Sequence, residues 1–258
     1  MPYPGIPEEA LETVGSPAPD AVAALRDALR PHADPPEAAL RTLLDFGRLL
    51  LAANQRVRLT GARDWEALVG PHLLDSLSAA ARVPADLRRF LDWGAGGGLP
   101  GLVWAAARPD WRLVLSERNR KKAAFLDDAA ARLDLANVEV RPVQAQEAWP
   151  RLQPRPDAVV ARAVEPLDRL LPKVSRLNPP PRALLVFGGP SWREAWGRCD
   201  APTRDAWTLA AVDDYEPGAG LGARSLLRFT PNRLRRGRGS AGAPPSAPVR
   251  NDSPEAAP

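Results

Sequence analysis

Two kinds of hydrophobic pattern divide the chain near residue 83. Over residues 36–54 the apolar side chains recur at three- and four-residue spacing, which predicts an amphipathic helix. A shorter helix is expected through residues 22–29. Asp64 can cap the start of another helix, and Pro71 is expected to open or kink the one after it. Residues 20–82 are therefore predicted to form a mainly helical extension.

From Phe90 onward, short apolar runs alternate with helical patterns. This alternation is typical of a parallel sheet covered by helices on both faces. Asn119 and Pro166 are expected to start two of these helices. Two later runs are joined without a helix and predict an antiparallel pair at the end of the sheet. Together the runs predict an α/β fold with a mixed seven-stranded sheet, its strands at residues 90–91, 113–115, 138–140, 158–160, 183–187, 208–215 and 224–230.

Composition and charge narrow the class of protein. One cysteine and two histidines cannot supply an internal disulfide or a usual zinc site, so no metal is expected. No apolar run approaches the roughly 20 residues of a membrane span, and the start of the chain lacks a secretory pattern, which predicts a cytoplasmic protein. Most of the net charge of +4 comes from five arginines after residue 231. We predict four segments: a loose lead-in (1–19), the helical extension (20–82), the sheet domain (83–232) and a basic, largely disordered tail (233–258).

A glycine-rich loop follows the first predicted strand, at residues 92–101 (DWGAGGGLPG). Loops at the carboxyl ends of parallel strands are where open α/β sheets bind ligands. Gly94, Gly96 and Gly98 carry no Cβ that would hold the backbone away from a ligand. Leu99 and Pro100 then lead into the next helix. The loop therefore predicts a bound nucleotide or nucleoside.

The identity of that ligand depends on two acidic residues. Residues 96–101 match the dinucleotide pattern G-x-G-x-x-G, so NAD is one candidate. Asp92 is expected to point into the pocket, where its charge disfavours a pyrophosphate and favours the ammonium of a methionine moiety. Glu117, after the second strand, can accept hydrogen bonds from the ribose hydroxyls of either ligand. The charge argument favours S-adenosylmethionine and leaves an NAD-dependent oxidoreductase as the alternative.

Further polar residues follow the later strands. Gln146 and Glu147 come after the third strand and either meet an adenine edge or belong to a solvated helix start. Arg162 ends the buried fourth strand and is expected to have a carboxylate or phosphate partner. His72 and Asp75 are weak candidates for an acid and a base, because a His-x-x-Asp pair on a helix is more often structural.

Four segments in order resemble one family: residues 72–77 (HLLDSL), 91–101, 120–126 (RKKAAFL) and 161–167 (ARAVEPL). Together they are similar to the small-subunit (16S) ribosomal RNA guanine-N7 methyltransferases, also called glucose-inhibited division protein B. The resemblance extends from about Leu40 to Arg238. It implies a Rossmann-like class I methyltransferase that uses S-adenosylmethionine to methylate N7 of one guanine. The implied partner is 16S rRNA or the small ribosomal subunit.

The resemblance also implies roles for individual residues. The family's cofactor positions fall on Gly94, Leu99, Gln146, Glu147 and Arg162. Guanine N7 carries a lone pair and no proton, so orientation is expected to supply most of the catalysis. A basic segment near the RNA corresponds to Arg235 and Arg236, with Arg233 and Arg238 beside them.

Three departures from the family pattern leave an alternative open. Arg58 stands where the family usually has asparagine, Pro71 where it has a basic residue, and Gly188 where it has lysine. These changes bear on substrate recognition more than on the cofactor pocket. The alternative is a catalytically weakened relative that binds S-adenosylmethionine, RNA or both.

Overall fold

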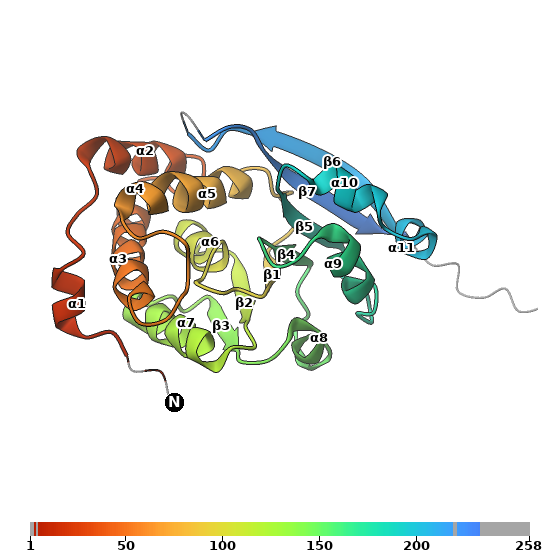
Figure 1. Ribbon diagram of the computed structural model, residues 1–258, viewed down its shortest axis with the longest axis horizontal. Coiled ribbons are helices and arrows are strands. Elements are labelled where there is room, and N and C mark those ends of the chain that lie inside the picture. The colour runs from red at the N-terminus through yellow and green to blue at the C-terminus, as the bar shows by residue number, and fades with distance from the viewer. Residues whose placement is uncertain (1–2, 4, 219–220, 233–258) are drawn as a thin grey trace, which may run out of the picture.

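The computed structural model describes residue 3, residues 5–218 and residues 221–232, and Figure 1 shows its architecture. A group of helices packs beside one sheet, as the hydrophobic pattern predicts. None of the described helices is both long enough and apolar enough to span a membrane. The helices before the sheet are α1 (Glu8–Glu12), α2 (Pro19–Leu29), α3 (Glu37–Asn54), α4 (Trp65–Leu68), a π-helical turn (Val69–Leu74) and α5 (Asp75–Ala80).

The sheet has seven strands in the order β3-β2-β1-β4-β5-β7-β6. The first five pair in parallel, and β7 is antiparallel to both β5 and β6. Each predicted strand is present with its ends moved by at most two residues, and the antiparallel pair lies at the end of the sheet as expected. The strands are β1 (Arg89–Trp93), β2 (Arg112–Ser116), β3 (Val138–Arg141), β4 (Ala158–Ala161), β5 (Ala183–Gly188), β6 (Trp207–Tyr215) and β7 (Arg224–Pro231).

Helices cover both faces of the sheet because alternate strand residues point to opposite sides. Phe90 belongs to one core with α2, α3, α5, α6 and α7, whereas its neighbour Leu91 belongs to the other core with α8, α9 and α10. The result is a three-layer domain in which the helical extension continues one helical layer. The helices of this part are α6 (Gly101–Ala107), α7 (Arg120–Arg132), α8 (Ala145–Ala148) with a 3-10 turn (Trp149–Arg151), α9 (Leu167–Val174), α10 (Trp192–Gly197) and α11 (Ala201–Ala206).

Side-chain caps fix several of these helices where the sequence predicts them. The Asp64 carboxylate accepts from Ala67 N, and Asn119 accepts from the backbone of Lys121 and Lys122 at the start of α7. Pro71 does not open a helix, one of the two expected outcomes, but lies inside the π-helical turn that joins α4 to α5. A π turn moves the backbone acceptor by one residue, which accommodates the missing proline donor.

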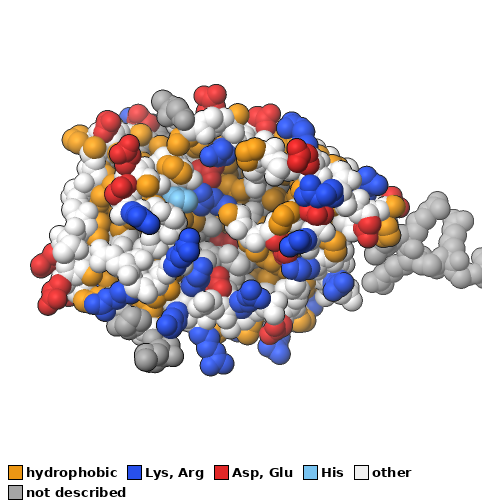
Figure 2. Space-filling view, in the orientation of Figure 1, with side chains coloured by type: hydrophobic (Ala, Val, Ile, Leu, Met, Phe, Trp, Pro, Cys, Tyr) orange, Lys and Arg blue, Asp and Glu red, His pale blue; other side chains and the backbone are white. Residues whose placement is uncertain are grey.

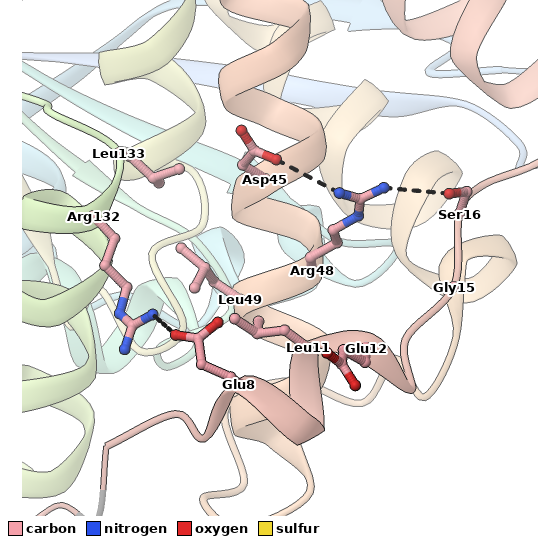
Figure 3. Close-up of a pocket in the computed structure, with 10 residues that line it drawn as sticks. All are labelled: Glu8, Leu11, Glu12, Gly15, Ser16, Asp45, Arg48, Leu49, Arg132 and Leu133. Atoms are coloured by element: carbon pink, nitrogen blue, oxygen red, sulfur yellow. Dashed lines mark hydrogen bonds and ion pairs between the residues drawn. The ribbon is translucent and has the colours of Figure 1, made fainter.

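The described residues of the lead-in predicted over residues 1–19 include the short helix α1. Ile6 is buried, and α1 packs on α3. Figure 3 shows how this segment borders a cavity of about 530 Å³ against α3 and α7. Glu8 is 3.4 Å from Arg132 of α7, and Arg48 of α3 donates to the Ser16 hydroxyl at 3.3 Å. This cavity lies away from the carboxyl ends of the strands.

Candidate functional site

A second cavity, of about 430 Å³, lies at the carboxyl edge of the parallel strands. Loops after β1, β2, β3 and β4 form its walls, so the parallel register brings segments far apart in sequence to one place. Its size is within the usual range for small-molecule sites. The predicted residues Gly94, Glu117 and Gln146 line it, and its other lining residues are Trp93, Ser116, Arg118, Asn119, Lys122, Val143, Gln144, Ala145, Val164, Glu165 and Lys173.

The glycine loop forms the wall after β1 and needs glycine for conformation and for space. Gly94, Gly96 and Gly98 have φ angles of +73°, +57° and +86°, a region that other residues rarely adopt. A Cβ on Gly98 would lie 2.5 Å from the Leu102 side chain. Gly94 is exposed at the cavity, whereas Gly96 and Gly98 are absent from its lining. The glycines therefore shape the loop, and only Gly94 offers its surface to a ligand.

Glu117 is held at the floor of the cavity by the loop that it faces. One carboxylate oxygen accepts from Gly96 N at 3.0 Å and the other from Asn119 N at 2.7 Å. The side chain is 8% exposed. Each carboxylate oxygen has a second lone pair, so Glu117 can also accept from two ligand hydroxyls. This is the geometry that a ribose requires.

Asp92 does not face the cavity. Its side chain is buried, and Oδ2 accepts from Gly101 N at 3.0 Å, at the start of α6. The pKa of Asp92 is raised to about 7, chiefly by burial and to a smaller extent by the nearby Glu117, against the lowering effects of Gly101 N and Arg162. The expectation that this carboxylate meets the ligand's ammonium is therefore not met by the geometry, since its acceptor is used at the helix start.

The two polar residues after β3, Gln146 and Glu147, differ in their position relative to the cavity. Gln146 lines the cavity together with Gln144, and both amides can pair with the edge of a purine base. Glu147 is exposed and outside the lining. Leu99 is half-buried and also outside it. Opposite them, Glu165 and Lys173 form an ion pair at 2.6 Å on the cavity wall.

Arg162 lies outside the cavity in a network with the helical extension. Its Nε is 3.1 Å from Oδ2 of Asp75, and Nη2 donates to the Pro71 carbonyl at 2.7 Å. Nη2 also donates to Nδ1 of His72 at 3.0 Å. Because guanidinium only donates, Nδ1 is the acceptor and Nε2 carries the proton toward the Thr60 hydroxyl, 3.2 Å away. The anionic partner expected for Arg162 is thus the carboxylate of Asp75.

The same network explains the electrostatics of His72 and Asp75. Burial and the Arg162 charge lower the pKa of His72 to about 4, so it is neutral at pH 7. Tyr215 donates to the other oxygen of Asp75 at 2.8 Å, and burial raises the pKa of this phenol. Neither His72 nor Asp75 lines the cavity. The geometry favours the structural interpretation of this pair over an acid–base role.

Several cavity residues escape the sequence analysis. Arg118, Asn119 and Lys122 follow Glu117 directly and lie at the mouth. Their signal is present in the chain, since the start of a helix after a ligand-binding strand faces the same edge of the sheet. Glu165 lies in the family segment 161–167 but had no predicted role, and Lys173 had no signal of either kind. The arginines expected to contact RNA, Arg233, Arg235, Arg236 and Arg238, lie outside the described residues.

The cavity fits a nucleoside cofactor. A buried carboxylate is aimed at the floor, two side-chain amides line one wall, and Gly94 lets the backbone approach. Val164, 38% exposed, and Trp93 add apolar contact surface. The cavity thus combines a largely polar and charged lining with two apolar side chains, and a nucleoside can use both kinds of contact.

Comparison with known proteins decides which family this site belongs to. The family model of rRNA small subunit methyltransferase G (GidB) matches residues 39–198. The chain belongs to this family. An rRNA small subunit methyltransferase G of Solibacter usitatus is 34% identical over 200 residues, which cover 77% of this chain and 92% of the relative. The corresponding protein of Halorhodospira halophila is 42% identical over 58% of this chain and 70% of its own.

A solved structure of an MtNAS mutant shares the fold, with a TM-score of 0.51 and 18% identity over 86% of each chain. Membership of the rRNA small subunit methyltransferase G family confirms the prediction of an rRNA methyltransferase that uses S-adenosylmethionine. It also decides against the NAD-dependent oxidoreductase, since the glycine pattern shared by both classes is now accounted for.

Proposed function

We propose that this methyltransferase G relative methylates N7 of one guanine in 16S rRNA, with the cofactor in the 430 Å³ cavity. The observation that carries the proposal is the Glu117 carboxylate, buried at the cavity floor in a chain of this family. The substrate is the rRNA as naked RNA or within the small subunit. Since that substrate is cytoplasmic, we propose the same location for the protein.

The lining suggests how the cofactor is oriented. Glu117 accepts from the ribose hydroxyls while it keeps Gly96 N and Asn119 N. Both Gln146 and Gly94 line the cavity, where Gln146 would pair with the adenine edge and the backbone at Gly94 would contact the methionine end. Leu99, Glu147 and Arg162 remain proposals from the family pattern, because none of them lines the cavity.

For methyl transfer to N7, the main task of the protein is to align the two reactants. S-adenosylmethionine supplies a methyl group on a sulfonium: the N7 lone pair forms the new N–C bond while the S–C bond electrons return to sulfur. No proton is removed, so no general base is required near N7. The residues at the cavity therefore hold two reactants in line, and alignment of this kind supplies a large part of a rate enhancement.

Cleavage of methylated rRNA tests the proposal. Borohydride and aniline break RNA at N7-methylguanine, so primer extension on 16S rRNA should show one stop that is absent in a strain without the gene. Purified protein with labelled S-adenosylmethionine should restore the stop on that strain's rRNA or small subunits. An identical pattern in the two strains, with no transfer in vitro, would refute the proposal.

The basic tail adds a second element. We propose that Arg233, Arg235, Arg236 and Arg238 contribute affinity for RNA phosphates, since arginines closely spaced in sequence suit this ligand. Truncation after Asn232 should weaken RNA binding and leave S-adenosylmethionine binding unchanged. Equal RNA affinity of the truncated and full chains would show that the tail only adds charge.

The three departures from the family pattern do not touch the cofactor cavity. Arg58, Pro71 and Gly188 are absent from its lining, and the Pro71 carbonyl accepts from Arg162 without needing a basic side chain there. The departures therefore leave the cofactor cavity intact, and we propose the active enzyme. Binding of S-adenosylmethionine without transfer to rRNA or subunits would reverse that preference.

A further inference from the structure

The loop between α3 and α4 forms a hollow with no role in the cofactor site. This cavity of about 590 Å³ is lined by Asn54, Gln55, Arg58, Thr60 and Arg63, with Leu51 at its base. The loop packs directly on the glycine loop: a Cβ on Gly97 would lie 3.1 Å from the Leu59 carbonyl oxygen. The hollow therefore lies on the same face of the molecule as the cofactor cavity, across the glycine loop from it.

Three hydrogen bonds of the Asn54 side chain hold this loop in shape. The Asn54 Oδ1 accepts from Leu59 N at 2.8 Å and Thr60 N at 3.0 Å, while Nδ2 donates to the Ala62 carbonyl at 2.8 Å. Thr60 is tied in turn to His72, the partner of Arg162. A loop whose backbone is fixed by its own side-chain bonds has a smaller ordering cost on binding, because only the exposed side chains remain to be ordered.

The groups that it presents are cations. Arg58 and Arg63 are exposed, and neither forms an ion pair within the described part of the chain. The Asp64 carboxylate is next to Arg63 but accepts from Ala67 N instead. By contrast, Arg48 and Arg132, on neighbouring helices, each face an aspartate.

A second group of cations lies at the start of α7. Arg118, Arg120 and Lys121 are exposed and form no ion pair among the residues that the structure describes. Figure 2 shows Lys and Arg side chains gathered on this face, over the loop that precedes α4 and over α7. Positive charge that forms no ion pair with any residue in the described ranges therefore lies on both sides of the glycine loop.

We infer that the loop over residues 55–63 is a phosphate-binding arm that holds the RNA backbone beside the target guanine, with Arg58 and Arg63 as the contacts. The inference rests on the proposed function, which places an RNA strand over this face. Guanidinium groups bind phosphate through two parallel hydrogen bonds. A preformed arm next to the cofactor would fix the position of the nucleotide, which is the alignment that methyl transfer needs.

The test compares two double variants of equal charge in the full chain. Arg58→Gln/Arg63→Gln removes the proposed contacts. Arg41→Gln/Arg112→Gln removes two exposed cations that form no ion pair among the described residues, in the first half of α3 and at the amino end of β2. The probe is deproteinised small-subunit rRNA, titrated at several salt concentrations, with S-adenosylmethionine binding measured by calorimetry on the same samples.

We expect Arg58→Gln/Arg63→Gln to weaken rRNA binding about tenfold and to reduce the salt slope by about 1.4 to 1.8, because two phosphate contacts are lost. S-adenosylmethionine affinity and melting temperature should match the wild type. Arg58→Lys/Arg63→Lys keeps both charges and should retain most of the slope. A loss equal to that of Arg41→Gln/Arg112→Gln would overturn the arm and leave the methyltransferase proposal intact, whereas wild-type protein that neither binds nor methylates rRNA would overturn both.

Discussion

The guanidinium of Arg162, at the end of β4, is 3.1 Å from the carboxylate of Asp75 in α5. The two side chains are 13% and 6% exposed, and 87 residues separate them in sequence. This pair joins the sheet to the helical extension. The extension and one face of the sheet also share a hydrophobic core, so the ion pair adds to an extensive contact between them.

Breaking this pair is expected to destabilise the protein strongly. Arg162→Gln leaves the Asp75 carboxylate buried with only the Tyr215 hydroxyl as partner, and a buried charge without its counterion costs about 3 to 5 kcal/mol. Urea unfolding measures the change in the free energy of unfolding. Arg198→Gln is the matched control, because it breaks a more exposed pair with Asp168 and should cost under about 1 kcal/mol. Equal losses would show that burial is not decisive.

The buried Asp92 is expected to make stability fall as the pH rises. Its pKa is raised to about 7 in the folded protein, so the folded state binds a proton here that the unfolded state has released above about pH 4. This stabilisation is complete below the unfolded pKa and is lost as the pH rises toward 7. Asp92→Asn cannot titrate and can still accept from Gly101 N through its amide oxygen. The free energy of unfolding of Asp92→Asn should rise relative to that of the wild type between pH 5 and pH 8. A difference that stays constant over this range would contradict the raised pKa of Asp92.

His72 is expected to act with the opposite sign. Its pKa is lowered to about 4 by burial and Arg162, so between about pH 6.5 and pH 4 the unfolded state binds the extra proton. Stability from this site is complete above the unfolded pKa and is lost as the pH falls through that window. His72→Gln should make the decline in melting temperature between pH 7 and pH 4.5 shallower. An unchanged slope would assign the decline to other groups, such as His32, whose pKa burial also lowers.

Gly101 has no room for a side chain. A Cβ there would lie 2.3 Å from the Leu115 side chain and 2.6 Å from the Asp92 carboxylate. Gly101→Ala should therefore destabilise the protein by about 1 to 3 kcal/mol and weaken cofactor binding, because the glycine loop must move. Gly197→Ala is the control, since an added Cβ meets nothing within 4 Å and alanine favours the helix. Thermal unfolding of the pair checks the prediction.

Two glutamates expected to bind the cofactor should differ in effect. Glu117→Gln replaces an acceptor-only carboxylate with an amide, and the loss of charged hydrogen bonds should raise the Kd for S-adenosylmethionine about tenfold or more. Glu147→Gln changes an exposed side chain outside the cavity and should leave the Kd unchanged. Calorimetry on both variants measures this. If Glu147→Gln raised the Kd more than Glu117→Gln, the cofactor would bind at Glu147, as the family resemblance implies, and outside this cavity.

The sequence by itself determined the elements and the site's location. Strand alternation around Phe90, the caps at Asp64 and Asn119, and the glycines after β1 are local signals, because each depends on residues within a turn or two. The same signals place Gly94, Glu117 and Gln146 at one edge, since parallel strands end together.

Only the tertiary structure decided where side chains point and what they bind. The Asp92 carboxylate turns to Gly101 N, and Arg162 turns to Asp75, although both follow strands that end at the cavity. The packing of α1 on α3 and the π-helical turn around Pro71 also depend on contacts between distant segments. Tyr215 reaches Asp75 across 140 residues. Contacts of this range leave no periodic pattern in the chain, because the partners meet only after the sheet and the helical extension have packed together.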